Sequence, residues 1–346
     1  MINVATALNG LPPVFDLRQL AAVGLSARVV QRALRGELVR RVGRGVFVAE
    51  AAWRESSPRD RHLLLTAAAA RLRPWAVVSH HSAACRFDLP LPLKMPPWVA
   101  LSTDQSAATG LPEGVTRLEP GRLPAHHVEE LSGLRVTSPA RTVIDCLREL
   151  PLPDAVAIAD AALRRGLIEV ADLEAVRQEQ RGWPFITAAD LGLRLLDPAR
   201  ETWFESWSFI RLWQLGVDLP ESQVSVYDHR GRFLGRVDGL WRDDATVAEA
   251  DGQGKYLGQF DPDGPSAEAA ARAVVAEKVR EDRMRGCGLE FVRWDRTMML
   301  TDALGVADQV ATTRRRGDIS HFTGQLVPPC SPLVAAKPPI HVRRAG

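Results

Sequence analysis

The strongest constraint on the fold is a pair of strand-like segments in the last third of the chain. Residues 233–241 and 246–251 are strand-like and are separated by a short turn-like segment, so we expect them to pair as a hairpin. Side chains alternate between the two faces of a strand. Glu249 and Asp251 therefore share one face, and the hairpin brings Asp238 near Glu249.

Three carboxylates on one face of a sheet repel one another unless a cation lies between them or some are protonated. An incomplete cage of oxygen ligands favours Mg²⁺, so Asp238, Glu249 and Asp251 are the predicted metal ligands. Lys255 lies just beyond the strand end, where its charge would orient a water or stabilise a phosphate. Glu205, on a preceding Trp-rich helix, would complete this candidate catalytic site.

The segments around the hairpin predict a separate α+β or α/β module. A helix is expected over residues 201–215 and a strand over 222–227. A long helix over 266–285 and a final strand over 289–294 follow the hairpin.

An aspartate followed about ten residues later by Glu-x-Asp-Gly resembles the PD-(D/E)XK nuclease superfamily. Residues 277–282 and 288–294 are similar to its very-short-patch-repair-like branch, the DUF559-type proteins. The resemblance covers residues 199–300. It implies a restriction-endonuclease-like mixed sheet flanked by helices, and hydrolysis of phosphodiesters with Mg²⁺. Asp251 stands where the superfamily usually has a lysine, and Lys255 stands near the place of a histidine found in many relatives.

The N-terminal residues predict two short helices followed by a β-hairpin. The first helix begins near Asp16, a residue type that caps helices, and ends at Gly24. The second covers residues 27–35, and two short strands within 38–48 flank a Gly-Arg-Gly turn. This order is that of a winged helix-turn-helix, so residues 1–55 are the expected DNA-binding domain.

Positive charge is concentrated in this N-terminal segment. The predicted DNA-binding residues are six arginines, accompanied by one acid, Glu37: Arg28, Arg32, Arg35, Arg40, Arg41 and Arg44. The first three share one helix face, and the others lie on or beside the hairpin. A recognition helix and a basic wing of this kind can contact the major groove and the adjacent phosphates.

The segment LAAVGLSARVVQRALRGELVRRVGRGVFV, residues 20–48, resembles the winged-helix domain of the abortive-infection type IV antitoxins. Residues 137–145 are similar to the middle region of such proteins. Actinobacterial chains often pair this module with the nuclease-like one. The resemblance implies DNA as a partner, together with a nucleotidyltransferase-type toxin.

Two other regions complete the expected organisation. Residues 56–198 alternate alanine-rich helices with strand-like runs and predict a mixed α/β middle region that ends at Pro198. Residues 313–346 carry three consecutive arginines at 314–316, contain five prolines and show little periodicity, so they are expected to be a disordered tail.

Composition narrows the class of protein only a little. Lys plus Arg number 44 against 42 for Asp plus Glu, so only local clustering can indicate a nucleic acid. No apolar run reaches the length of a membrane helix, and no signal peptide is evident, so a cytoplasmic protein with reduced thiols is expected. No P-loop, Rossmann or hydrolase-elbow motif occurs. The pair His126-His127 has no Cys or acid at zinc-ligand spacing.

Three hypotheses follow from these patterns. The first is an antitoxin-like DNA-binding regulator whose nuclease-like domain is structural or weakly active. The second is a Mg²⁺-dependent endonuclease directed by its winged helix. The third is an antitoxin whose main partner is a toxin protein.

Overall fold

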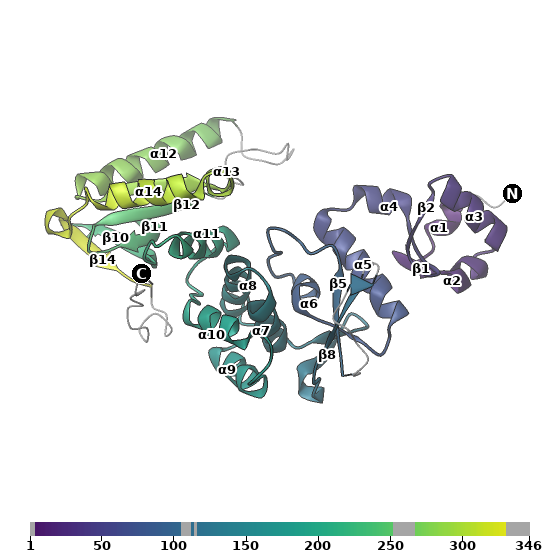
Figure 1. Ribbon diagram of the computed structural model, residues 1–346. Helices are drawn as coiled ribbons and strands as arrows, with labels where there is room; N and C mark the ends of the chain where they lie inside the picture. The colour runs from purple at the N-terminus through teal and green to yellow at the C-terminus, as the bar shows by residue number, and fades with distance from the viewer. Residues whose placement is uncertain (1–3, 105–111, 114–115, 252–266, 330–346) are drawn as a thin grey trace. The chain divides into compact units, whose positions relative to one another are not determined.

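The computed structural model describes residues 4–104, 112–113, 116–251 and 267–329 (Figure 1). It is an α+β structure with three sheets. Contacts divide the chain into two compact units, Met1–Leu150 with Leu167–Ala189, and Pro151–Gly166 with Asp190–Gly346. No helix in the described ranges combines the length and the apolar character needed to span a membrane.

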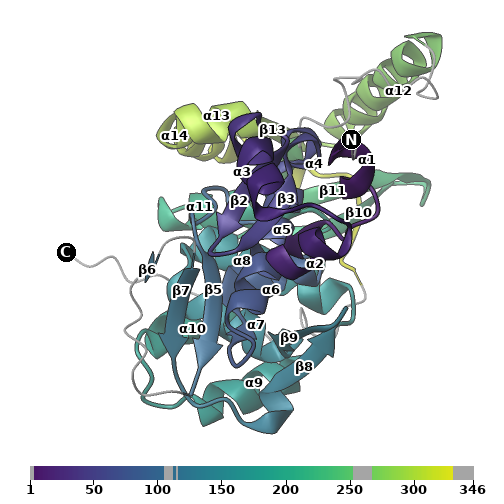
Figure 2. The ribbon, with the colours of Figure 1, turned by 90° about the vertical axis from the view of Figure 1, so that its right-hand side faces the viewer.

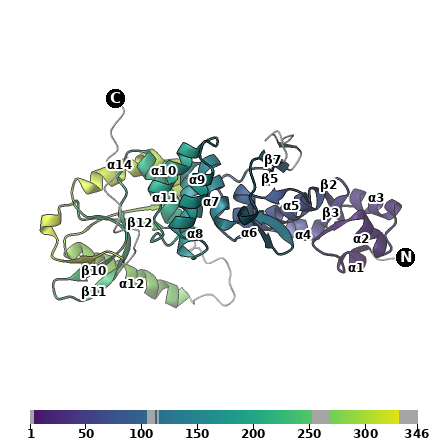
Figure 3. The same cartoon turned by 90° about the horizontal axis from the view of Figure 1, so that it is seen from below.

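The first unit begins with a small helical and antiparallel part. Its elements are α1 (Val4–Leu8), β1 (Val14–Asp16), α2 (Leu17–Ala22), α3 (Ala27–Arg35), β2 (Val39–Gly43) and β3 (Val46–Ala49), with sheet order β1-β3-β2. Figure 3 shows the three helices gathered around β2 and β3. Asp16 caps α2 as predicted, because its carboxylate accepts the N–H of Gln19 at 2.9 Å. Buried Leu20 and Val30 join Phe15 and Phe47 in one apolar core.

The remainder of the first unit is a mixed sheet with helices packed on it. Its helices are α4 (Glu50–Glu55), α5 (Pro58–Leu72), α6 (His80–Arg86), η1 (Ala125–His127), α7 (Pro139–Glu149) and α9 (Val170–Glu179). Its strands are β4 (Val77–Val78), β5 (Val99–Thr103), β6 (Pro112–Glu113), β7 (Thr116–Pro120), β8 (Val128–Leu131) and β9 (Leu134–Thr137). The order is β6-β7-β5-β4-β9-β8, with β5 parallel to its neighbour β7 (Figure 2).

The second unit contains a five-stranded sheet in the order β13-β12-β11-β10-β14. Its strands are β10 (Glu221–Asp228), β11 (Phe233–Trp241), β12 (Thr246–Asp251), β13 (Glu290–Asp295) and β14 (Gly324–Val327). Its helices are α8 (Leu152–Arg164), α11 (Trp203–Gln214), α12 (Ala267–Gly286), α13 (Arg296–Thr301), α14 (Ala303–Arg314) and the short η2 (Ile319–His321), while α10 (Ile186–Arg194) begins in the first unit. The predicted hairpin is confirmed, because β11 and β12 pair antiparallel with Gly239 opposite Ala248.

The expectation of a disordered tail from residue 313 is wrong for its first part. Helix α14 continues to Arg314, and β14 pairs antiparallel with β10, with Val327 opposite Ser225. The physical reason is apolar burial, since Phe322 and Leu326 pack against the core of the second unit. Residues 330–346 of the expected tail lie outside the described residues.

A buried ion pair joins α8 to the start of the second unit's main body. The carboxylate of Asp160 accepts hydrogen bonds from Arg200 at 3.0 Å, Ser206 at 2.8 Å and the N–H of Asp197 at 2.7 Å. Asp160 is fully buried, so its charge requires these partners. The chain segment 151–166 therefore belongs with the second unit, whereas the sequence grouped it with the middle region.

We predict that Asp160→Ala lowers the free energy of unfolding by about 3–5 kcal/mol, because it leaves the buried guanidinium of Arg200 without its carboxylate. Urea denaturation followed by circular dichroism measures the loss. Asp308→Ala is the control, since Asp308 is exposed on α14 and its removal should cost under about 0.5 kcal/mol. Equal losses for the two variants would show that the Asp160 ion pair does not stabilise this unit.

Candidate nucleic-acid interface and carboxylate site

The arginines predicted to bind DNA are exposed on α3 and on the β2–β3 hairpin. In α3 the buried residues Val30 and Ala33 face the core, and this leaves the arginines of the helix on the solvent side. Across the described residues, no carboxylate lies within ion-pair distance of five of the six: Arg28, Arg32, Arg35, Arg41 and Arg44. Their charges are therefore available to an external anion.

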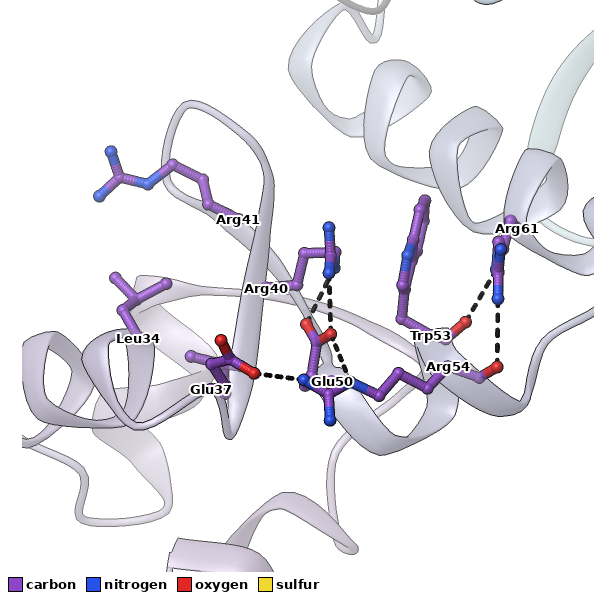
Figure 4. Close-up of a pocket in the computed structure, with 9 residues that line it drawn as sticks. Leu34, Glu37, Arg40, Arg41, Glu50, Trp53, Arg54 and Arg61 are labelled. Carbon is purple, nitrogen blue, oxygen red and sulfur yellow. Dashed lines mark hydrogen bonds and ion pairs between the residues drawn. The ribbon is translucent and has the colours of Figure 1, made fainter.

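Arg40 differs from the other five because a buried glutamate holds it. Its guanidinium donates to both carboxylate oxygens of Glu50 at 2.8 Å and lies 5.2 Å from the ring centre of Trp53 (Figure 4). Arg54 donates to Glu50 at 3.0 Å and also pairs with Glu37. The hydrogen bond from Arg40 lowers the pKa of Glu50. Arg40 is thus committed to this internal pair, which sequence spacing did not indicate.

The same side chains line a cavity of about 490 Å³ beside the hairpin. The Trp53 ring lies between two guanidiniums, because Arg61 is 5.7 Å from its centre and donates to the Trp53 carbonyl (Figure 4). Arg41 borders the cavity and its guanidinium lies 5.8 Å from the ring of Phe47. The network fixes the base of the hairpin and leaves the turn with Arg44 exposed.

In the second unit, two of the three predicted metal ligands do come together. Asp238 and Glu249 each directly adjoin a residue of the Gly239–Ala248 pair in the β11–β12 hairpin. Asp238 accepts the N–H of Ala250 at 3.0 Å. Burial, together with the charge of Asp238, raises the pKa of Glu249 to about 8.

Arginines lie against two of these carboxylates. Arg280 of α12 donates to Glu249 at 3.3 Å, and Arg293 of β13 pairs with Asp251 at 3.3 Å. The structure does not bring one ligand atom from each of Asp238, Glu249 and Asp251 within 4.8 Å of one another. As arranged, this donor set does not fit a resident Mg²⁺, because guanidiniums supply the compensating positive charge.

Glu205 and Lys255 are the other two residues of the predicted catalytic set. Glu205 is buried and caps α11: its carboxylate accepts the N–H groups of Glu201 and Thr202 at 2.9 and 3.1 Å. The amide of Gln223 also donates to it at 2.9 Å. These bonds commit Glu205 to the helix start. Lys255 lies outside the described residues.

A histidine cluster in the first unit was not predicted from sequence spacing. His126 and His127 lie 3.1 and 3.4 Å from the carboxylate of Glu179, which the fold brings in from α9. Arg141, however, donates to Nδ1 of His127 at 3.1 Å. A guanidinium donates hydrogen bonds and cannot accept one, so Nδ1 of the neutral ring is the acceptor and Nε2 carries the hydrogen. A metal ligand would need a lone pair on Nε2. The cluster is therefore better described as hydrogen-bonded than as metal-binding.

Comparisons with known proteins find similarity over part of the chain. No family model matches the chain. Two proteins of Mycobacterium tuberculosis, the uncharacterized proteins MT2308 and Rv2248, are each 35% identical over 122 residues, which is 35% of this chain and 45% of theirs. The chain therefore matches less than half of their length. The crystal structure of the RV2827C protein from Mycobacterium tuberculosis aligns with a TM-score of 0.36 and 19% identity, over 59% of this chain and 79% of that one.

We predict that Glu249 makes the second unit less stable as pH rises. Its pKa is about 8 when folded and near 4.5 when unfolded, so the folded chain retains a proton that the unfolded chain releases between these values. The free energy of unfolding should fall from pH 5 to pH 8, and Glu249→Gln should flatten this decline. Denaturation at each pH measures it, with the exposed Glu174→Gln as control. A decline of equal slope in Glu249→Gln would contradict the prediction.

Proposed function

We propose that the chain is a DNA-binding regulator whose N-terminal part acts as a winged helix-turn-helix. The proposal is supported by the order of α2, α3 and the antiparallel strands β1, β2 and β3. In this assignment α3 is the recognition helix and the β2–β3 turn is the wing. The observation that carries the proposal is the set of five exposed arginines that no described carboxylate neutralises.

The arrangement suits phosphate contacts better than an internal structural role. An exposed guanidinium without a partner contributes little to folding, whereas on a nucleic acid it releases a condensed counterion. Arg32 on α3 and Arg44 at the hairpin turn lie on the two elements that such a domain applies to DNA. Arg40 serves instead to hold the hairpin to Glu50.

In this proposal the nuclease-like unit does not hydrolyse DNA. Its carboxylates Glu249 and Asp251 face Arg280 and Arg293, and a cation at this position would have to displace the guanidiniums. The arginines offset part of the negative charge at this position but supply no activated water.

We predict that Arg32→Ala and Arg44→Ala each weaken binding to duplex DNA and reduce the slope of log affinity against log salt by about one, because each removes one phosphate contact. Gel shifts over a salt series measure both quantities. Arg181→Ala removes an exposed charge elsewhere in the same unit and should leave the slope unchanged. If all three variants behave like the wild type, the interface is misassigned.

We also predict that the purified chain leaves plasmid and single-stranded DNA intact with Mg²⁺ or Mn²⁺. Gel electrophoresis of the products detects cleavage. Cleavage by the wild type that disappears in Asp238→Ala and in Glu249→Ala would contradict this prediction and establish the endonuclease alternative. Cleavage that survives both substitutions would point to a contaminant or to another site.

A further inference from the structure

A second cavity of about 490 Å³ opens within the first unit, away from the α3 arginines. It lies at the carboxyl ends of β5 and β7, which are parallel neighbours with Ser102 beside Glu119. The turn that follows β7 supplies Gly121 and Arg122 to its wall, and α7 supplies Glu149. Ligands of open α/β sheets bind outside the carboxyl ends of parallel strands, so its place in the fold is that of a binding site.

Two buried polar side chains at this cavity lack a hydrogen bond from the described protein. The Ser102 hydroxyl has no partner there, although Ser102 is 1% exposed. Nε2 of His80 also lacks a well-formed hydrogen bond, and its nearest carboxylate oxygen, on Glu149, is 3.4 Å away. Buried polar groups are normally satisfied. These two are therefore positioned to bond to a molecule inside the cavity.

Charged side chains of both signs line the cavity. The lining includes four arginines against two carboxylates, Glu119 and Glu149: Arg117, Arg122, Arg141 and Arg148. Asp145 lies beneath and pairs with two of the arginines, at 2.7 and 2.9 Å. Arg117 in turn pairs with Glu119 and Glu149. Among the described residues, Arg122 is the lining arginine that no carboxylate pairs with. Guanidiniums bind phosphate and carboxylate oxygens in a fork-like geometry, so the charge of Arg122 favours an anionic ligand.

The surroundings of Glu119 and Glu149 shift the pKa values of these two carboxylates in opposite directions. Burial and the charge of Glu149 raise the pKa of Glu119. Burial disfavours the charge on Glu149 as well, but His80 and the neighbouring arginines lower its pKa overall. Glu149 is thus held in its ionised form, with His80, Arg117 and Arg148 around it.

Aromatic side chains form one wall of the cavity. The guanidiniums of Arg141 and Arg148 lie 4.8 and 5.1 Å from the ring centre of Trp183. A side chain at Gly121 would come within 2.7 Å of this ring, so glycine is what allows the close approach. Phe185, also in the lining, is 68% exposed. An exposed phenyl ring on the wall of a charged cavity offers a face to the organic part of a ligand.

We propose that this cavity binds a small organic anion whose oxyanion group meets the guanidinium of Arg122 and whose organic part lies against Phe185. Ser102 and His80 supply the remaining hydrogen bonds. The proposal is independent of DNA binding by α3. Phosphate esters and amino acids share this chemistry, and the choice of probes separates them.

The test is isothermal titration of the full chain with the four nucleoside 5′-monophosphates, with L-glutamate and with inorganic phosphate. We expect saturable binding of at least one organic anion, more tightly than inorganic phosphate. Ser102→Ala and Arg122→Ala should each weaken it by about tenfold. Ser102→Ala removes a hydroxyl with no bond to a described residue, so the fold should not suffer; thermal denaturation checks this.

Arg181→Ala is the matched control for Arg122→Ala, because both arginines are exposed in the same unit and Arg181 does not line the cavity. Three results would overturn the proposal. They are no saturable binding of any probe, binding of inorganic phosphate as tight as that of every organic anion, and unchanged affinity in both Ser102→Ala and Arg122→Ala.

Discussion

The pairing of guanidinium with carboxylate groups determines what each part of this chain can do. An arginine that is paired with a carboxylate is not available to an external anion, since its charge and hydrogen bonds are used within the fold. Arg40 is such a residue, because Glu50 binds it at both oxygens. Arg32 and Arg44 have no such partner in the described chain and can contact an external anion. The proposed DNA-binding surface is defined by this difference rather than by the number of arginines.

Pairing of guanidinium with carboxylate groups also determines the chemistry of the carboxylate cluster in the second unit. Burial, and then the charge of the neighbouring Asp238, raise the pKa of Glu249, and such shifts cluster at functional sites. Arg280 and Arg293 bring positive charge to this face from α12 and β13. These arginines lower the pKa of Glu249 by less than burial and Asp238 raise it, so the folded chain holds a proton on Glu249 up to about pH 8. In the proposed function, a nuclease-like pattern persists in the sequence of this unit while the first unit binds DNA.

Much of the fold could be predicted because it depends on local patterns. The β11–β12 hairpin follows from alternating side chains around a polar turn, and the α2 cap follows from Asp16. The pairing of β14 with β10 could not be predicted, because Leu326 becomes a core residue only when the strand meets a distant partner. A proline-rich segment without periodicity gives no local sign of that contact.

The candidate sites show the same limit. Spacing correctly placed Asp238 beside Glu249, because both lie within one hairpin. It could not reveal Arg280, which reaches Glu249 from a helix whose packing is tertiary. Glu179 beside His126 and the cavity at the ends of β5 and β7 are likewise products of long-range contacts. Tertiary packing decides which charged side chains pair with the residues of a site, and no local sequence motif marks these partners.

Backbone hydrogen–deuterium exchange of the full chain, with and without duplex DNA, tests the central claim most directly. The account predicts that DNA slows exchange in α3 and in the β2–β3 hairpin, and leaves exchange in α12 and β13 unchanged. Protection confined to α12 and β13, with none in α3, would contradict it.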